Sequence, residues 1–175
     1  MKKIKVAIIF IILIILLFIV CTSGKSPKEP PKITITIGDR EMKYIVAKNQ
    51  WDGAIYDRED TFKAILKKDS DADIPHIEIG KNAMISFNNH PPTKLAVLDI
   101  LIDKNGNRMY SNMGIANIPV ELKKGKYSFE IKKHPASFLS SKHEENKIDI
   151  RGFRIIASWG ENECEYAFII RTDGA

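Results

Sequence analysis

Three aspartates at alternate positions, Asp69, Asp71 and Asp73, form the pattern in this chain that most resembles a metal site. Carboxylates at the first, third and fifth positions are typical of a calcium-binding loop. The pattern then fails, because Ile74 occupies the position that needs glycine and Gly80 the position that needs a bidentate carboxylate. We therefore interpret the segment as a solvated acidic turn, keep its aspartates as a weak calcium candidate, and expect no cofactor.

The remaining residues with reactive side chains do not form a catalytic pattern. Zinc sites need closely spaced ligand pairs, and the four histidines have no such spacing with one another or with a cysteine, so we expect them on the surface. Cys164 alternates with Tyr166 and Phe168, which places its thiol on the core side of a strand. Neither a serine elbow nor a Ser-x-x-Lys motif occurs. We assign no catalytic residue and predict that the protein is not an enzyme.

Aromatic side chains offer a different kind of site. An exposed indole stacks well on a carbohydrate or a peptide, so Trp51 and Trp159, with Tyr110, are candidates for a ligand platform. The alternative is that the tryptophans pack in or around the core, as large aromatic residues usually do.

The N-terminal segment has the composition of an export signal. Three lysines precede an unbroken apolar run of fifteen residues, Val6–Val20, which is at the upper edge for a signal peptide and short of the ~20 residues that span a bilayer. The segment Phe18–Cys21 resembles a bacterial lipobox, in which the cysteine is lipidated, but Val20 stands where a small residue is usual. Residues 1–21 are thus either a signal peptide with lipidation at Cys21 or an uncleaved membrane anchor.

Charge and composition indicate where the folded domain begins. Six of the 27 basic and one of the 22 acidic side chains precede Ile33, which leaves 21 of each sign in residues 33–175. A domain without net charge has no overall field that attracts phosphate backbones, so nucleic acid is not expected as a partner. Residues 22–32 are rich in proline and lysine and should form a stiff, extended tether.

Residues 33–175 read as an all-β domain. Ile33–Ile37 alternates strictly and predicts a strand, with a returning strand over 42–46. Asp60 or Thr61 could cap a short helical turn, and 76–79 and 94–102 are further strand candidates. Within 94–102 the face of Ala96, Leu98, Ile100 and Ile102 is wholly apolar, and we expect it to face the core. Short strands with turn residues between them predict an antiparallel sandwich.

The most clearly patterned part of the chain is a hairpin formed by 153–159 and 164–171, turning at Gly160–Asn162. These residues, with their Trp159 and Tyr-Ala-Phe sequence (166–168), resemble the closing segment of uncharacterised extracytoplasmic, lipoprotein-like proteins of Gram-positive bacteria. Similar hairpins occur in outward-facing modules of some sensor-type membrane peptidases. The resemblance implies an immunoglobulin-like β-sandwich and assigns no catalytic residue.

These observations predict a membrane-attached domain that faces the extracellular side of the cell membrane. We expect a binding or interaction module whose partner is another envelope protein or a cell-surface ligand. Two alternatives stay open: a hydrolase or inhibitor module that uses acidic loops around Asp57 and Asp73, with or without calcium, and a purely structural spacer.

Overall fold

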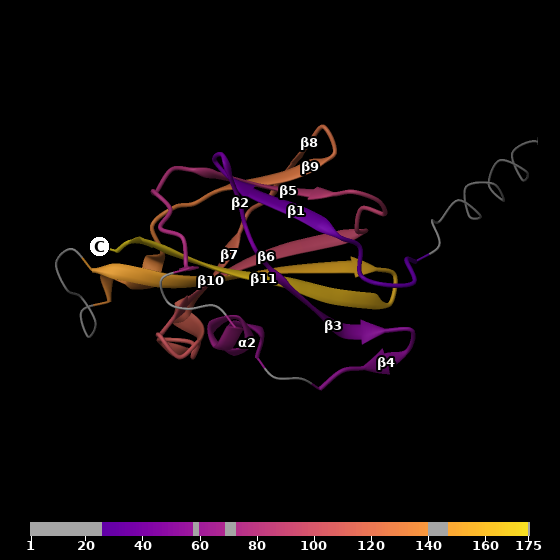
Figure 1. Ribbon diagram of the computed structural model, residues 1–175, viewed down its shortest axis with the longest axis horizontal. Helices are drawn as coiled ribbons and strands as arrows, with labels where there is room; N and C mark the ends of the chain where they lie inside the picture. Colours follow the sequence, from indigo (N-terminus) through magenta and orange to yellow (C-terminus); the bar gives the residue numbers. More distant parts are fainter. Residues whose placement is uncertain (1–25, 58–59, 69–72, 140–146, 175) are drawn as a thin grey trace, which may run out of the picture.

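The fold is a sandwich of two antiparallel β-sheets with one α-helix outside the larger sheet (Figure 1). The computed structural model describes residues 26–57, 60–68, 73–139 and 147–174. The prediction of an all-β antiparallel sandwich is confirmed. In this part of the chain, none of the helices combines the length and the apolar character that a bilayer crossing requires. The proposed membrane segment, residues 1–21 with Cys21, lies outside the described residues.

The smaller sheet has five strands in the order β2-β1-β5-β9-β8. Its β1 strand buries all three isoleucines and leaves both threonines partly exposed, as strict alternation predicts for a sheet with one face in the core. The tight turn before β9 uses Lys124 and Gly125, both at positive φ, which suits a two-residue hairpin loop. The strands are β1 (Ile33–Ile37), β2 (Arg40–Glu41), β5 (Asn82–Phe87), β8 (Glu121–Lys123) and β9 (Lys126–Glu130).

The larger sheet has six strands in the order β4-β3-β11-β10-β6-β7. Its centre is the predicted terminal hairpin, in which β10 and β11 pair without interruption from Ile148 opposite Asp173 to Trp159 opposite Asn162. The remaining strands add to both sides of this hairpin. The strands are β3 (Ile45–Trp51), β4 (Ala54–Ile55), β6 (Lys94–Ile102), β7 (Ile115–Ile118), β10 (Ile148–Trp159) and β11 (Asn162–Asp173).

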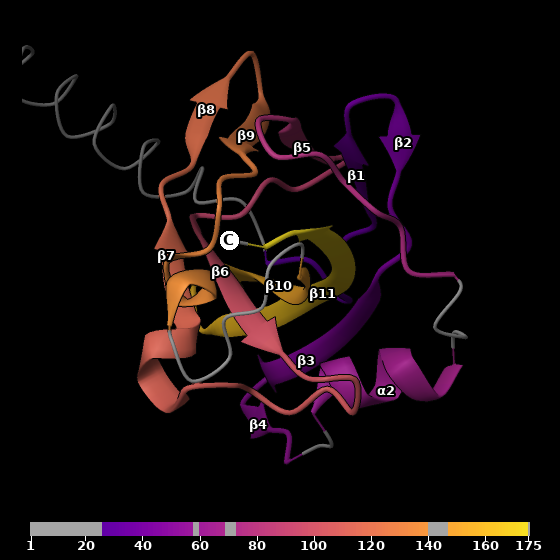
Figure 2. The same cartoon turned by 90° about the vertical axis from the view of Figure 1, so that its left-hand side faces the viewer.

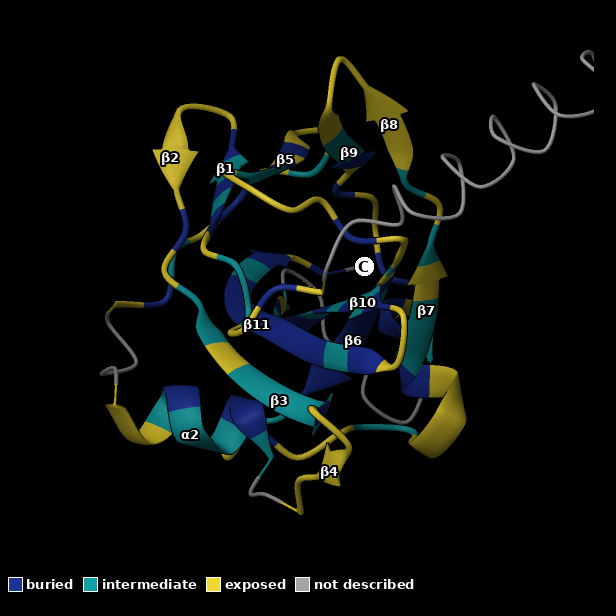
Figure 3. Ribbon diagram, turned by 90° about the vertical axis from the view of Figure 1, so that its right-hand side faces the viewer, coloured by how far each residue is buried: buried dark blue, intermediate teal, exposed yellow. Residues whose placement is uncertain are grey.

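Both faces of the larger sheet pack against other parts of the fold, one along most of the sheet and the other in part. One face meets the smaller sheet across an apolar core that contains Phe153, Tyr166 and Phe168. The other face is covered by the helix α2 (Thr61–Lys68), which buries Phe62 and Ile65 against the sheet (Figure 2). β11 is accordingly buried over most of its length and β10 over most of its first half, after which β10 alternates between buried and half-buried residues. The outer strands β2, β4 and β8 are exposed (Figure 3).

The helix determines which of the two cores the apolar face of β6 enters. Ile100 and Ile102 belong to the apolar cluster beneath α2, not to the core between the sheets. Val97, from the opposite face of the strand, enters that inter-sheet core, and Asp99 shares its orientation. A wholly apolar face therefore marks the side that the helix covers.

Two predicted strands also differ from the structure. Only Arg40 and Glu41 return along β1, and after Met42 the chain crosses to the larger sheet, where β3 begins at Ile45. The segment 76–79 forms a single bridge, between His76 and Arg171, instead of a strand. In both places the chain pairs with β11, which is far away in the sequence.

Candidate binding groove

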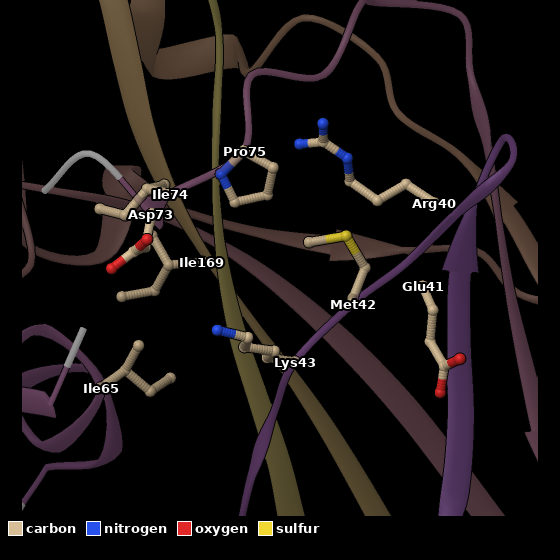
Figure 4. A pocket seen from close by; sticks show the side chains of 9 residues that line it. All are labelled: Arg40, Glu41, Met42, Lys43, Ile65, Asp73, Ile74, Pro75 and Ile169. Carbon is tan, nitrogen blue, oxygen red and sulfur yellow. The ribbon is translucent and has the colours of Figure 1, made fainter. Parts of the chain in front are cut away.

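A hollow with an apolar floor lies between α2, the crossover from β2 to β3, and the segment that follows α2 (Figure 4). We call it the α2 groove, and its volume is about 240 Å³. It is lined by Arg40, Glu41, Met42, Lys43, Ile65, Asp73, Ile74, Pro75 and Ile169.

The floor of the α2 groove is apolar and belongs to the two cores. Ile65, Ile74 and Ile169 are part of the cluster beneath α2, and Met42 is part of the core between the sheets. The backbone N–H of Met42 donates to the carbonyl of Ile35 at 2.8 Å, which fixes the crossover beside β1. The floor is thus built from packed, rigid elements.

Backbone hydrogen bonds hold the far wall of the groove against β11. The N–H of Arg171 donates to the carbonyl of Pro75 at 2.8 Å, and the N–H of Ile77 donates to the carbonyl of Arg171 at the same distance. A wall tied to the central strand in this way keeps its shape without a ligand, which is a usual property of a binding site.

Charged side chains of both signs surround the apolar floor. Lys43 points across the groove toward Ile169 and Ile65, whereas Glu41 points away from it (Figure 4). Lys43 and Ile65 also line a second hollow of about 230 Å³ together with Tyr44, Ile45 and Lys68, so the concave surface continues along the helix.

The N-terminal end of α2 is fixed by an electrostatic cluster on the outer face of the sheet. Asp60 accepts a hydrogen bond from the backbone N–H of Phe62 at 2.9 Å, which confirms the predicted cap, and pairs with the Arg154 guanidinium at 2.6 Å. That guanidinium also lies 4.7 Å from the centre of the Phe62 ring. Thr61 donates to the buried carboxylate of Glu165. These contacts position Ile65 in the groove.

A second group of polar side chains is buried at the end of the sandwich where β10 begins. Arg151 forms an ion pair with Asp99, and each side chain is 1% exposed. The Arg151 guanidinium also lies near the hydroxyl of Thr172, at 3.4 Å, and over the ring of Phe153, at 5.4 Å from its centre. Both charges are compensated inside the core, as burial demands.

Serine, histidine and aspartate occur together in this group, but not in a catalytic arrangement. Ser137 donates to Asp149, whereas His134 accepts from the backbone N–H of Ala136 at 3.1 Å and faces the carbonyl of Asp99 at 3.3 Å. A nucleophilic serine needs a base within hydrogen-bond reach, and the imidazole has its hydrogen bonds elsewhere. His134 is buried, so the prediction that all histidines lie on the surface is wrong for this residue.

The two tryptophans of the predicted ligand platform lie in the core. Trp51 is 1% exposed and Trp159 is 5% exposed, and their rings pack edge to face with centres 5.9 Å apart. The indole N–H of Trp51 donates to the carbonyl of Lys28 and that of Trp159 to the carbonyl of His90. Both indoles are buried, so they form no ligand platform, and the alternative that the tryptophans pack in the core is confirmed.

Tyr110 lies apart from the tryptophans. It immediately precedes a short 3₁₀ helix, Ser111–Gly114, and follows the end of β6 that pairs with Ile150. Trp159 is at the opposite end of β10, so the structure does not bring these three aromatic residues together.

The acidic turn is only partly described. Asp69 and Asp71 lie outside the described residues, and Asp73 is an exposed residue at the rim of the α2 groove. Among the residues that the structure describes, no group of three or more His, Cys, Asp or Glu side chains could hold a metal ion. Among the described residues, Glu41 is the only other carboxylate that lines the groove, and its side chain points away (Figure 4).

Cys164 is buried, as its alternation with Tyr166 predicts. Burial raises the pKa of its thiol to about 11, so the thiolate that reacts with electrophiles is scarce at neutral pH.

Comparisons with known proteins do not assign the chain to a family. No protein-family model matches it, and neither does any curated protein.

The α2 groove was not predicted from the sequence, because its lining comes from segments that only the crossover after Met42 brings together.

Proposed function

We propose that this protein is a membrane-attached, outward-facing binding module, and that the α2 groove binds an apolar side chain of another envelope protein. The observation that carries this proposal is the groove itself. It has a volume of about 240 Å³, an apolar floor and charged residues of both signs at its rim. Pockets that enclose a drug-sized ligand measure about 300–1,000 Å³, so this hollow suits one side chain of a protein partner better than a whole small molecule.

An immunoglobulin-like type of sandwich is part of the proposal. In that fold, strands A, B, E and D form one sheet and G, F and C the other, with C′ added at the edge in variable-type domains. The order β1-β5-β9-β8 opposite β11-β10-β6-β7 agrees with this scheme when strands are lettered along the chain. β2, β3 and β4 are then additions, and β3 and β4 extend the larger sheet beyond strand G.

Membrane attachment is supported by the N-terminal sequence. Basic residues followed by Val6–Val20 are typical of an export signal or an anchor, and a cytoplasmic position of the lysines places the following domain outside the cell. Such a location gives access to other envelope proteins and to cell-surface ligands.

Site-specific photo-crosslinking in intact membranes tests the binding proposal. A photoreactive amino acid replaces Arg40, at the rim of the groove, or Thr34, on the outer face of the smaller sheet, as the matched control. We expect an adduct to one defined protein from position 40 only, joined at an apolar residue of the partner. We also expect Lys43→Glu to weaken this adduct several-fold, whereas Lys126→Glu, at the start of β9, leaves it unchanged. Equal adducts from positions 40 and 34, or none from position 40, would contradict the proposal.

A further inference from the structure

The segment that precedes β1 is attached to the sandwich instead of standing clear of it. The carbonyl of Lys28 accepts from the Trp51 indole at 2.9 Å, and the carbonyl of Pro31 accepts from the Tyr166 hydroxyl at 2.6 Å. The Ser26 hydroxyl donates to the carbonyl of Trp159 at 3.0 Å, and Pro27 is buried. The predicted tether therefore does not act as a free spacer after Ser26.

Both aromatic donors are themselves fixed, which makes the attachment stable. Trp51 and Tyr166 are fully buried core residues, so removal of the segment would leave their polar hydrogens without these partners. A salt bridge of 2.6 Å between Lys48 of β3 and Glu29 adds a weaker, exposed contact.

Little chain is left between this attachment and the membrane. Five residue steps separate Ser26 from Cys21, the position of lipidation or the end of the anchor. A fully extended chain covers at most about 3.6 Å per residue, so Ser26 lies within about 18 Å of Cys21.

Ser26 lies at a defined end of the sandwich. It contacts Trp159, the last residue of β10, and so lies beside the β10–β11 turn. The β3–β4 turn is at the same end, because the N–H of its Asp52 donates to the Asn162 side chain at 2.9 Å (Figure 1). The loop that contains His90 joins this end through its hydrogen bond with the Trp159 indole. We call these turns and this loop the tether end.

The tether end also exposes residue types that tolerate a lipid headgroup region. Ile55 of the two-residue strand β4 is 83% exposed and the neighbouring Tyr56 is 43% exposed. Lys28 and Lys32 are exposed on the attached segment. Tyrosine and lysine near an aliphatic side chain are typical of surfaces that rest on the membrane interface.

We infer that the tether end rests at the lipid surface and that the opposite end of the sandwich points away from it. This inference depends on the membrane attachment proposed above. The far end contains the turn at Lys104, after β6, because the end of β6 pairs with the beginning of β10. The eleven residue steps from the first to the last residue of β10 separate the two ends by about 36 Å at 3.3 Å per step.

Energy transfer to labelled lipids tests this orientation in the full-length protein. Glu161→Cys, in the β10–β11 turn, and Lys104→Cys each receive a donor dye, and the parent protein measures background labelling. The proteins are reconstituted in vesicles of phosphatidylcholine and phosphatidylglycerol that contain an acceptor lipid. Because the two positions differ in height by up to about 36 Å, we expect transfer from position 161 to be at least about twofold more efficient.

Two controls separate the inference from the proposal on which it depends. Failure of the protein to co-float with vesicles would overturn membrane attachment, whereas co-flotation with equal transfer from both positions would overturn the orientation alone. A flexible Gly-Ser linker of about ten residues, inserted after Gly24, should lower the transfer from position 161 toward that from position 104. Unchanged transfer with this linker would overturn the short tether as the cause of the orientation.

Discussion

Gly152, in the middle of β10, allows α2 to approach the larger sheet. A Cβ atom at this position would lie 2.5 Å from Cζ, 2.6 Å from Cε1 and 2.8 Å from Cε2 of Phe62. These distances are too short for carbon atoms that are not bonded, and the Phe62 ring is buried and cannot turn into solvent. The substitution Gly152→Ala must therefore displace either the ring or the whole helix.

The expected cost follows from this overlap. Extra methyl groups in a well-packed core destabilise by roughly 1–3 kcal/mol, and displacement of the ring also weakens its contact with the Arg154 guanidinium. A loss of about 2 kcal/mol lowers the Tm of a domain of this size by about 4–8 °C. Because Ile65 follows Phe62 by one turn of the same helix, displacement of α2 also deforms the α2 groove.

Urea denaturation followed by circular dichroism measures the free energy of unfolding. The matched variants are Phe62→Leu, which removes the ring, and the double variant that combines it with Gly152→Ala. We expect the double variant to be at least about 1 kcal/mol more stable than the sum of the single effects, because leucine leaves room for the new methyl group. Additive effects, or a cost of Gly152→Ala below about 0.5 kcal/mol, would refute this account of helix packing.

Three further predictions concern buried and charged groups. Asp99→Ala should lower the free energy of unfolding by about 3–5 kcal/mol, because it leaves the Arg151 guanidinium buried without its partner. Replacement of both residues by leucine and methionine should cost much less. Equal costs of the two changes in urea denaturation would contradict the ion-pair argument. Burial raises the pKa of Asp103, but hydrogen bonds from the Asn107 side chain and from the backbone of Asn107 and Asn105 outweigh it, so the net shift is downward. The stability that Asp103 contributes should be complete above the ordinary pKa of 3.8 and disappear as the pH falls through the lower pKa of the folded state. Asp103→Asn should therefore flatten this part of the pH profile of the Tm. An unchanged profile would count against a stabilising role of the Asp103 carboxylate. Cys164, whose pKa is raised to about 11, should react with a thiol reagent at pH 8 only after denaturation; peptide mapping that finds it rapidly modified in native buffer would disprove its burial.

The sequence predicted the local elements of this fold well. The β10–β11 hairpin, the alternating strand β1, the cap of α2 and the buried thiol of Cys164 all depend on neighbouring residues, whose pattern is visible in the chain. Gly152 is also informative in retrospect, because glycine inside an apolar strand often marks a place where another group approaches closely.

Features that depend on distant segments were predicted poorly. The chain after Met42 was expected to return along β1 but pairs with β11, since nothing local in the sequence specifies the sheet that a strand joins. The apolar face of β6 was expected to face the core, and Ile100 and Ile102 are buried, but beneath α2 instead of between the two sheets, which the pattern of one strand does not reveal. For Trp51 and Trp159 the sequence left a ligand platform and core packing both open, and the core packing that the structure shows depends on carbonyl groups of distant segments that accept from both indoles.

The order in which this chain is synthesised has a consequence for how it folds. β11 is the last strand of the sandwich in the chain, yet it lies between β3 and β10 in the larger sheet. Until β11 is present, β3 has no partner toward the centre of that sheet, and the segment 75–77 has no strand to bind. The nascent chain therefore stays open until its final strand is made, and that strand completes both cores together. A chain truncated before Asn162 should be digested by proteases that leave the complete domain intact.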